Sequence, residues 1–130
     1  MSIVRFAARL SALALLAPCL ALAAPLEVAP EDVMAALSGP DKPVIVDVRS
    51  VDEYRAAHIP GAINIPHDTI AERFGEIAEH ASDGRLVLYC RSGRRVGIAA
   101  EFLESHGFSR LNHLTGDFDG WQAAGGAIER

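Results

Sequence analysis

A cysteine followed at once by a cationic loop is the feature of this 130-residue sequence with the clearest capacity for chemistry. The residues after Cys90 are Arg91, Ser92, Gly93, Arg94 and Arg95. A cysteine attacks electrophiles as its thiolate, and cations or a helix amino terminus near the sulfur favour that form. Gly93 can take backbone conformations closed to other residues, so successive amide N–H groups can point at one centre. We therefore predict a nucleophile inside an anion-binding nest.

The residues on either side of this loop predict the elements that position it. The apolar run at 86–89 is typical of a strand buried on both faces, as in a parallel sheet. From Val96 the apolar residues recur at helical spacing, so we expect a helix that begins at about Arg95. Cys90 would then stand at the carboxyl end of a strand and opposite a helix amino terminus. Ligands bind at that edge of open α/β sheets.

The rest of the chain alternates between short strands and helices. Strands are expected at about residue 27 and at 44–48, 62–65, 86–89 and 111–114. Helices are expected up to residue 38, after Ser50, after Thr69, from about residue 95 and at 117–124. Ser50 and Glu53 fit a capping box, Thr69 fits a helix cap, and Trp121 is expected in the core. This alternation predicts one three-layer α/β/α domain with a mainly parallel five-stranded sheet.

The spacing within the loop separates two classes of cysteine enzyme. Protein tyrosine phosphatases need an arginine six residues after the nucleophile, and Val96 occupies that position here. The loop at 90–95 instead resembles the active-site loop of rhodanese-type sulfurtransferases. Other segments that resemble this family's motifs are residues 46–49, 53–54, 58–62 and 114–116, with Trp121. The resemblance runs from about residue 26 to residue 128, and the motifs appear in the family's order.

The resemblance implies a fold, a reaction and a set of roles. In a rhodanese-type thiosulfate sulfurtransferase the cysteine takes the outer sulfur of a donor such as thiosulfate and becomes a persulfide. The persulfide then passes its sulfur to a thiophilic acceptor, either cyanide or a thiol. Mapped onto this sequence, Cys90 is the nucleophile, the backbone amides of residues 91–95 hold the sulfur and the anion, and the arginine heads attract the sulfonate. No cofactor and no metal is implied.

Two other functions remain open from the residues alone. One is a non-catalytic sulfur-relay or interaction module, in which a partner supplies the persulfide. The other is a small phosphatase or arsenate reductase that uses the same nest. Val96 at the arginine position and a loop too tight for a tetrahedral phosphate disfavour that second alternative.

Two positions depart from the family pattern. Ala57 stands where a glycine often precedes the histidine, and Asp117 follows Gly116 where a second glycine is usual. We expect neither residue to touch Cys90, so that the departures alter loops without abolishing activity. Asp117 is expected to place a negative charge near the entrance of the site and so to affect the choice of acceptor.

Other polar residues have structural interpretations. Asp47 and Arg49 are expected to form a structural ion pair near the active-site edge, and His58 is expected to organise a turn through hydrogen bonds. The remaining histidines are scattered along the sequence: His67, His80, His106 and His113. They form no metal-ligand pattern and no evident pair with Cys90.

The first 23 residues are typical of a secretory signal peptide that precedes a domain at 24–130. Two arginines lead into an apolar run that is too short for a membrane-spanning helix. We therefore expect export, to the periplasm in a Gram-negative cell, and no stable membrane association after cleavage. Cleavage would remove Cys19 and leave Cys90 as a lone thiol without a disulfide partner.

The overall charge argues against two classes of partner. The chain has 12 basic and 17 acidic residues, and loss of Arg5 and Arg9 would leave ten basic residues and a formal charge of −7. An acidic domain has no general means of binding nucleic acid or an anionic membrane. The arginines beside Cys90 therefore stand out as a local cationic patch suited to a small anionic sulfur donor.

Overall fold

The computed structural model describes residues 24–81 and 84–130, so the leader expected at 1–23 lies outside the described part. Within that part, five strands form one sheet in the order β1-β5-β4-β2-β3, with every adjacent pair parallel. The strands are β1 (Leu26–Val28), β2 (Val44–Asp47), β3 (Ile63–Asn64), β4 (Arg85–Tyr89) and β5 (Arg110–Leu114). The helices are α1 (Pro30–Leu37), α2 (Val51–Ala56), α3 (Ile70–His80), α4 (Arg94–Ser105) and α5 (Asp117–Ala123), and the 3-10 helix η1 (His67–Thr69) precedes α3.

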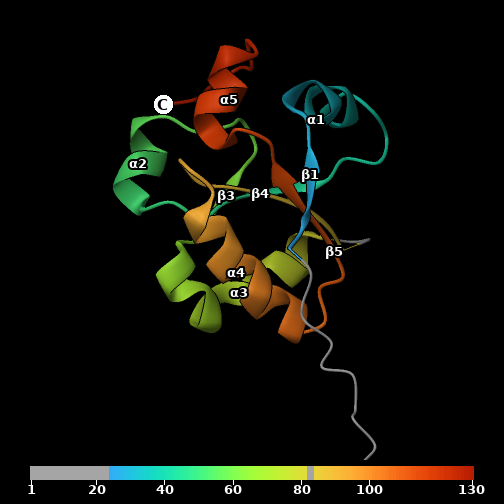
Figure 1. Ribbon diagram of the computed structural model, residues 1–130, viewed down its shortest axis with the longest axis vertical. Coiled ribbons are helices and arrows are strands. Elements are labelled where there is room, and N and C mark those ends of the chain that lie inside the picture. Colours follow the sequence, from blue (N-terminus) through green and yellow to red (C-terminus); the bar gives the residue numbers. More distant parts are fainter. Residues whose placement is uncertain (1–23, 82–83) are drawn as a thin grey trace, which may run out of the picture.

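Helices cover both faces of the sheet, with α3 and α4 on one side and α1 and α5 on the other (Figure 1). The side chains of β4 alternate between the two cores. Leu86 and Leu88 pack in the core that includes α3 and α4, whereas Val87 and Tyr89 pack in the core that includes α1 and α5. A strand buried on both faces in this way needs a continuous apolar sequence. The predicted three-layer α/β/α fold is confirmed, and its sheet is wholly parallel within the described residues.

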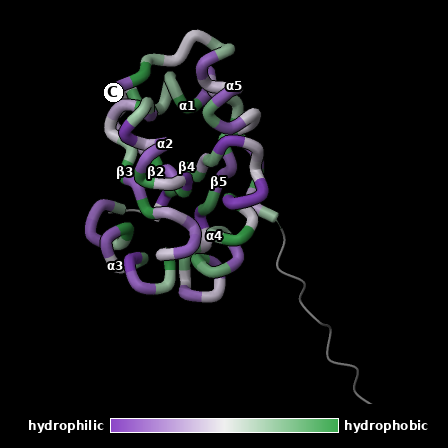
Figure 2. Tube along the Cα trace, turned by 90° about the vertical axis from the view of Figure 1, so that its left-hand side faces the viewer, coloured by the Kyte–Doolittle hydropathy of each residue, from purple (hydrophilic) through white to green (hydrophobic). Residues whose placement is uncertain are grey.

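The distribution of hydropathy follows the same layers. Figure 2 shows hydrophobic segments on the strands between the helices, whereas much of α3 is hydrophilic. Only one stripe of α3 is buried, through Ile70 and Ile77, with Phe74 packed beside them. Such an amphipathic helix covers a sheet on one side and meets solvent on the other.

Local signals set the start of two helices. Ser50 Oγ accepts a hydrogen bond from the Glu53 N–H while Glu53 accepts from the Ser50 N–H, which confirms the capping box of α2. Thr69 is the N-cap residue of α3, as expected, but its side chain makes no capping hydrogen bond. The Thr69 hydroxyl donates to the Pro66 carbonyl instead, because η1 already leads the chain into α3.

The carboxyl ends of β2, β4 and β5 lie side by side, and this edge of the sheet carries the predicted site. In the register of the sheet, Asp47 lies beside Tyr89 and Leu88 lies beside His113. The residues that follow these strands therefore meet around Cys90. The fold brings together groups from three separate parts of the sequence at one edge.

Candidate functional site

Cys90 directly follows β4 at the carboxyl edge of the sheet, as the strand–loop–helix pattern predicts. The Gly93 N–H donates to Cys90 Sγ across 2.8 Å, so an amide donor faces the sulfur. Gly93 has φ 98°, a left-handed conformation that other residues rarely adopt, and it is the N-cap of α4. Cys90 is fully buried, at 0% exposure. The sulfur therefore lies under the loop, whose Arg91 and Ser92 are exposed.

Arg95 is held beside the loop by a carboxylate of α2. Its Nη1 and Nη2 donate to the two carboxylate oxygens of Glu53 across 2.6 and 2.9 Å. The hydrogen bond from Arg95 is the largest cause that lowers the pKa of Glu53 to about 2. The same pairing raises the pKa of Arg95, and the proximity of Cys90 adds to that rise. Arg95 thus lies between Glu53 and the thiol.

The other two loop arginines have different surroundings. Arg91 and Arg94 are both exposed. Arg91 lines a hollow of about 240 Å³ at this edge, together with Glu53 and Phe118. Cys90 itself does not line this hollow. Of the three cations that the sequence places near the thiol, one lies on the hollow, one is paired with Glu53, and Arg94 is on the outside.

Asp117 touches Cys90, contrary to the expectation from the sequence. Its Oδ1 accepts from the Cys90 N–H across 2.9 Å and lies 2.9 Å from His113 Nε2. The Phe118 N–H donates to the Cys90 carbonyl across 3.0 Å. Asp117 has φ 55° and is 4% exposed, so its carboxylate points under the loop and not toward the entrance of the site. The start of α5 therefore holds both backbone polar groups of Cys90.

The pair formed by His113 and Asp117 favours its charged form. Burial alone would raise the pKa of Asp117, but hydrogen bonds from His113 and from the Cys90 N–H outweigh it and lower that pKa. The hydrogen bond to Asp117 is the largest cause that raises the pKa of His113, against the effect of burial. The geometry brings a histidine to the loop through a carboxylate, where the sequence indicates no cysteine–histidine pair.

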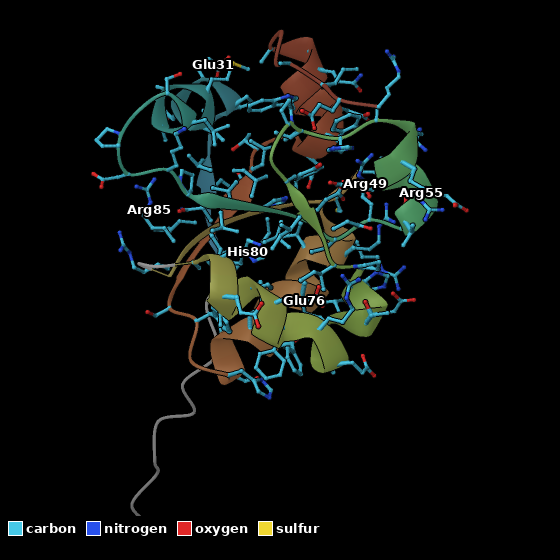
Figure 3. All side chains as sticks on the ribbon, turned by 180° about the vertical axis from the view of Figure 1, so that it is seen from behind. Glu31, Arg49, Arg55, Glu76, His80 and Arg85 are labelled. Atoms are coloured by element: carbon cyan, nitrogen blue, oxygen red, sulfur yellow. The ribbon has the colours of Figure 1, made fainter. Side chains whose placement is uncertain are left out.

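Arg49 and Asp47 form the structural ion pair that the sequence predicts. Arg49 Nε and Nη2 donate to the Asp47 carboxylate across 3.0 and 2.6 Å, and Nη2 also donates to the Ala57 carbonyl across 2.8 Å. The guanidinium carbon lies 4.2 Å from the centre of the Phe118 ring. Figure 3 shows Arg49 on the inner side of α2 and Arg55 on its outer side. Arg49 therefore joins β2, the turn after α2 and α5, and it also lines the hollow that Arg91 lines.

His58 has the turn-organising role that the sequence predicts. Its Nδ1 lies 2.8 Å from the Tyr54 carbonyl oxygen, and its ring stacks on that of Tyr54 at a centroid distance of 3.8 Å. Its Nε2 lies 3.2 Å from Glu129 Oε2, which ties this turn to the end of the chain. His58 is thus occupied by local structure away from Cys90.

Residues 24–81 and 84–130 contain neither a metal-ligand cluster nor a membrane-spanning helix. No group of three or more His, Cys, Asp or Glu side chains in this part is arranged to hold a metal ion. No helix in it is both long enough and apolar enough to cross a membrane.

Three contacts at the site were not predicted from the sequence: those of Glu53, His113 and Asp117. The sequence places Glu53 in a capping box and in a family motif, but it does not predict that the same carboxylate reaches Arg95. The available signal for Asp117 was its place at a position where the family usually has glycine. Because the backbone at this position is left-handed, the side chain points in a direction that it would not take in a standard turn.

The sequence model of the rhodanese-like domain matches residues 29–124. The chain belongs to the rhodanese-like domain family. The matched segment includes every strand of the sheet except β1, and it contains the whole loop from Cys90 to Arg95. The family resemblance drawn from the motifs is confirmed.

Relatives within this family are moderately similar. A thiosulfate:glutathione sulfurtransferase of Saccharomyces cerevisiae is 34% identical over 93 residues, which cover 64% of this chain and 67% of that protein. A putative sulfur carrier protein of Bacillus subtilis, YrkF, is 34% identical over 77 residues, covering 59% of this chain and 40% of that protein. The crystal structure of a thiosulfate sulfurtransferase from Pseudomonas aeruginosa matches with a TM-score of 0.70 and 30% identity, covering 82% of this chain and 20% of that one. The last two relatives are thus much longer than the region they share with this chain.

Proposed function

We propose that this protein is a sulfurtransferase that moves sulfane sulfur from thiosulfate, or a similar small anionic donor, to a thiophilic acceptor through Cys90. The observation that carries the proposal is the environment of the sulfur. Cys90 ends a buried strand, receives the Gly93 N–H and lies next to the Arg95 guanidinium. Membership of the rhodanese-like family and the named sulfurtransferase relatives support sulfur transfer in general.

The proposed reaction has two steps that balance. The Cys90 thiolate attacks the outer sulfur of thiosulfate, the bond between the two donor sulfurs breaks, and sulfite leaves with the electron pair. The outer sulfur remains on Cys90 as a persulfide. In the second step an acceptor nucleophile, cyanide or a thiolate, attacks that outer sulfur, and the Cys90 thiolate is released. These steps need no cofactor or metal, because the transferred sulfur is held covalently on Cys90 between them.

The loop residues have distinct proposed roles. The backbone amides of residues 91–95, which include those of Ser92 and Gly93, would stabilise the charge on the transferred sulfur. Arg91 would attract the sulfonate of the donor, because its side chain lines the hollow. Arg95 is already paired with Glu53 and would support the thiolate from the side. Arg94 is exposed and would contribute only to the long-range field.

The burial of Cys90 constrains how a donor arrives. The residue has 0% exposure, so a donor reaches the sulfur only when side chains beside the loop move outward. Small and slender anions are therefore the proposed donors. The same burial favours the second candidate function, a sulfur relay in which a partner protein opens the site and supplies the persulfide. The similarity to a putative sulfur carrier protein also supports this candidate.

The place of action is a separate proposal. We propose that the segment 1–23 directs export and is removed, which would leave the domain from residue 24 onward in the periplasm of a Gram-negative cell. The acidic composition of the chain disfavours nucleic acid as a partner, whereas the arginines of the loop at 91–95 support a small anion as the partner. Mass spectrometry of the protein recovered from the extracytoplasmic fraction tests this, and a chain that retains residues 1–23 contradicts it.

Thiosulfate-dependent formation of thiocyanate from cyanide tests the main proposal. The wild type is expected to turn over, and Cys90→Ser is expected to be inactive because serine cannot form the persulfide. Trypsin releases the peptide 86–91, whose single cysteine is Cys90, and after thiosulfate treatment this peptide should gain the mass of one sulfur atom. Equal turnover by both proteins contradicts the proposal. A stable sulfur adduct with negligible turnover indicates the relay function instead.

A pair of arginine variants tests the donor contact. Arg91→Gln is expected to raise KM for thiosulfate about tenfold with a smaller change in kcat, because one charged hydrogen-bond donor is lost. Arg55→Gln is the matched control, since Arg55 is an exposed arginine on the outer side of α2 (Figure 3). Equal KM values for the two variants would show that Arg91 does not bind the donor.

A further inference from the structure

Asp117 has a left-handed backbone conformation, which is uncommon outside glycine although Asp and Asn adopt it more readily than most residues. Among the described residues it is the one non-glycine with positive φ, at 55°. Left-handed conformations are unfavourable for residues with a β-carbon, and they persist where the surroundings over-determine them. The rhodanese motif usually has glycine here. The left-handed conformation is therefore a feature of the fold, whereas the carboxylate is a feature of this chain. The contacts of the carboxylate must therefore offset this strain.

The carboxylate and its histidine contact the nucleophile's loop at two points. At the start of the loop, Asp117 Oδ1 accepts from the Cys90 N–H. In the middle of the loop, the pair lies against Gly93: a β-carbon built there would come within 3.2 Å of His113 Cε1 and 3.4 Å of Asp117 Oδ2. Gly93 is the residue whose N–H donates to Cys90 Sγ. The pair therefore supports the donor to the sulfur as well as the backbone of Cys90.

The net charge of this pair depends on one proton. With His113 protonated, the pair is neutral overall, and with His113 neutral it leaves one buried negative charge beside the thiol. Glu27 on β1, opposite His113 in the sheet register, is the other charged group that faces the pair, whereas Arg95 lies near the Cys90 thiol itself. A nearby negative charge disfavours a thiolate, and a nearby positive charge favours it.

We propose that His113 and Asp117 are positioning residues for Cys90, and that the proton on His113 controls how readily the Cys90 thiol ionises. The inference rests on the proposed function only in taking Cys90 as the reactive group. It adds a regulation by pH: the thiolate is favoured while His113 is protonated and is disfavoured once His113 loses its proton. The hydrogen bond to Asp117 raises the pKa of His113, which extends the favourable range toward neutral pH.

Alkylation of Cys90 by iodoacetamide tests the proposal without any sulfur donor. The rate is measured over a series of pH values on the full chain, from the fraction of the tryptic peptide 86–91 that is modified. His113→Gln leaves Asp117 without its cation. At pH 6, below the raised pKa of His113, we therefore expect Cys90 of this variant to be alkylated about tenfold more slowly than in the wild type. Adding Asp117→Asn removes the remaining charge while its amide oxygen still accepts from the Cys90 N–H. The double variant is therefore expected to return toward the wild-type rate at pH 6.

The outcomes separate charge control from a purely structural role. An unchanged alkylation rate at pH 6 in His113→Gln overturns the proposal, and so does a double variant that stays as slow as the single one. A structural role alone would lower the melting temperature without producing the reversal. Because no thiosulfate is used, failure of sulfur transfer with the rate difference intact would reject the proposed function and leave this inference standing.

A second measurement uses proteins that keep His113 and Asp117. Coupling between two protons is reciprocal, so ionisation of Cys90 must also favour the protonated form of His113. We compare the titration of the His113 ring by NMR in the wild type and in Cys90→Ser, which cannot ionise. The midpoint for His113 is expected to be lower in Cys90→Ser, and identical midpoints overturn the proposal.

Discussion

Two carboxylates hold the Cys90 loop from opposite sides, and they do so in different surroundings. Glu53 of α2 binds Arg95 near the surface, where the two side chains are 31% and 24% exposed. Asp117 of α5 binds His113 and the Cys90 N–H with its side chain only 5% exposed. Partly exposed ion pairs contribute little to stability, whereas removing one partner from a buried pair is costly. The loop thus has one weak support and one strong support.

The two pairs also differ in how they respond to pH. The pKa of Glu53 is lowered to about 2, and arginine does not titrate, so that pair stays charged at neutral pH. His113 titrates nearer neutrality, so the other pair changes its charge. The charge of the Glu53–Arg95 pair is therefore constant near neutral pH, whereas the charge of the His113–Asp117 pair varies with pH. The predictions below test this contrast.

The largest expected effect comes from Asp117→Ala. It leaves the buried Cys90 N–H without an acceptor and removes the partner of His113, so we expect the free energy of unfolding to fall by about 3 kcal/mol. Urea unfolding measures the change. Asp119→Ala is the control, because Asp119 is an exposed carboxylate in the same helix and should cost far less. Similar losses for the two variants would show that Asp117 does not hold the loop.

Gly93→Ala is expected to have the next largest effect. At φ 98° a β-carbon is strained, and it would come within 3.2 Å of His113. We expect a loss of about 1–2 kcal/mol in the free energy of unfolding, together with slower alkylation of Cys90. Gly97→Ala is a matched control of opposite sign. Gly97 lies inside α4 with nothing within 4 Å of its β-carbon position, so alanine there should stabilise the helix by up to about 1 kcal/mol.

The pH dependence of stability should distinguish the two pairs. The raised pKa of His113 contributes stability below the ordinary value of 6.5, and that contribution is lost as pH rises through the folded-state pKa. The stability difference between wild type and His113→Gln should therefore shrink from about pH 5 to about pH 9. The difference between wild type and Glu53→Gln should stay constant over that range, because the lowered pKa of Glu53 matters only below 4.5. If the two stability differences changed with pH in the same way, the proposed difference between the two pairs would be contradicted.

The smallest expected effect comes from Glu53→Gln. Glutamine can still complete the capping box with Ser50, so only the charge pair with Arg95 is lost. We expect a change of about 0.5 kcal/mol in the free energy of unfolding. Ser50→Ala, which removes the cap and keeps the ion pair, should cost about 1 kcal/mol. A loss above that value for Glu53→Gln would mean that the surface pair supports the loop more strongly than its exposure indicates.

The elements of the fold were predictable because their signals are local. The apolar run at 86–89, the capping box at Ser50 and the glycine at 93 each determine structure within a few residues. Thr69 is the N-cap residue of α3, but its hydroxyl makes no capping hydrogen bond because a 3-10 turn precedes α3. The sequence of that turn does not distinguish these two ways of starting a helix.

The candidate site was predictable only in its nucleophile and loop. Glu53 meets Arg95 across 42 residues of sequence, and Asp117 meets Cys90 across 27. Such contacts follow from the register of the sheet and from the direction of one left-handed residue, which a motif does not specify. The sequence also gave no indication of the larger apolar cavity, about 770 Å³, at the amino edge of β2. His80 contributes to this cavity, and Figure 3 shows it away from Arg49.

The attachment of Cys90 to α5 has a consequence during synthesis. A ribosome completes residues 90–95 well before it reaches Phe118, whose N–H binds the Cys90 carbonyl. A nascent chain therefore carries the full loop sequence while its thiol lacks the partners that orient it. We therefore expect the proposed reactivity of Cys90 to require the docking of α5, so that a chain truncated before Phe118 presents an ordinary cysteine.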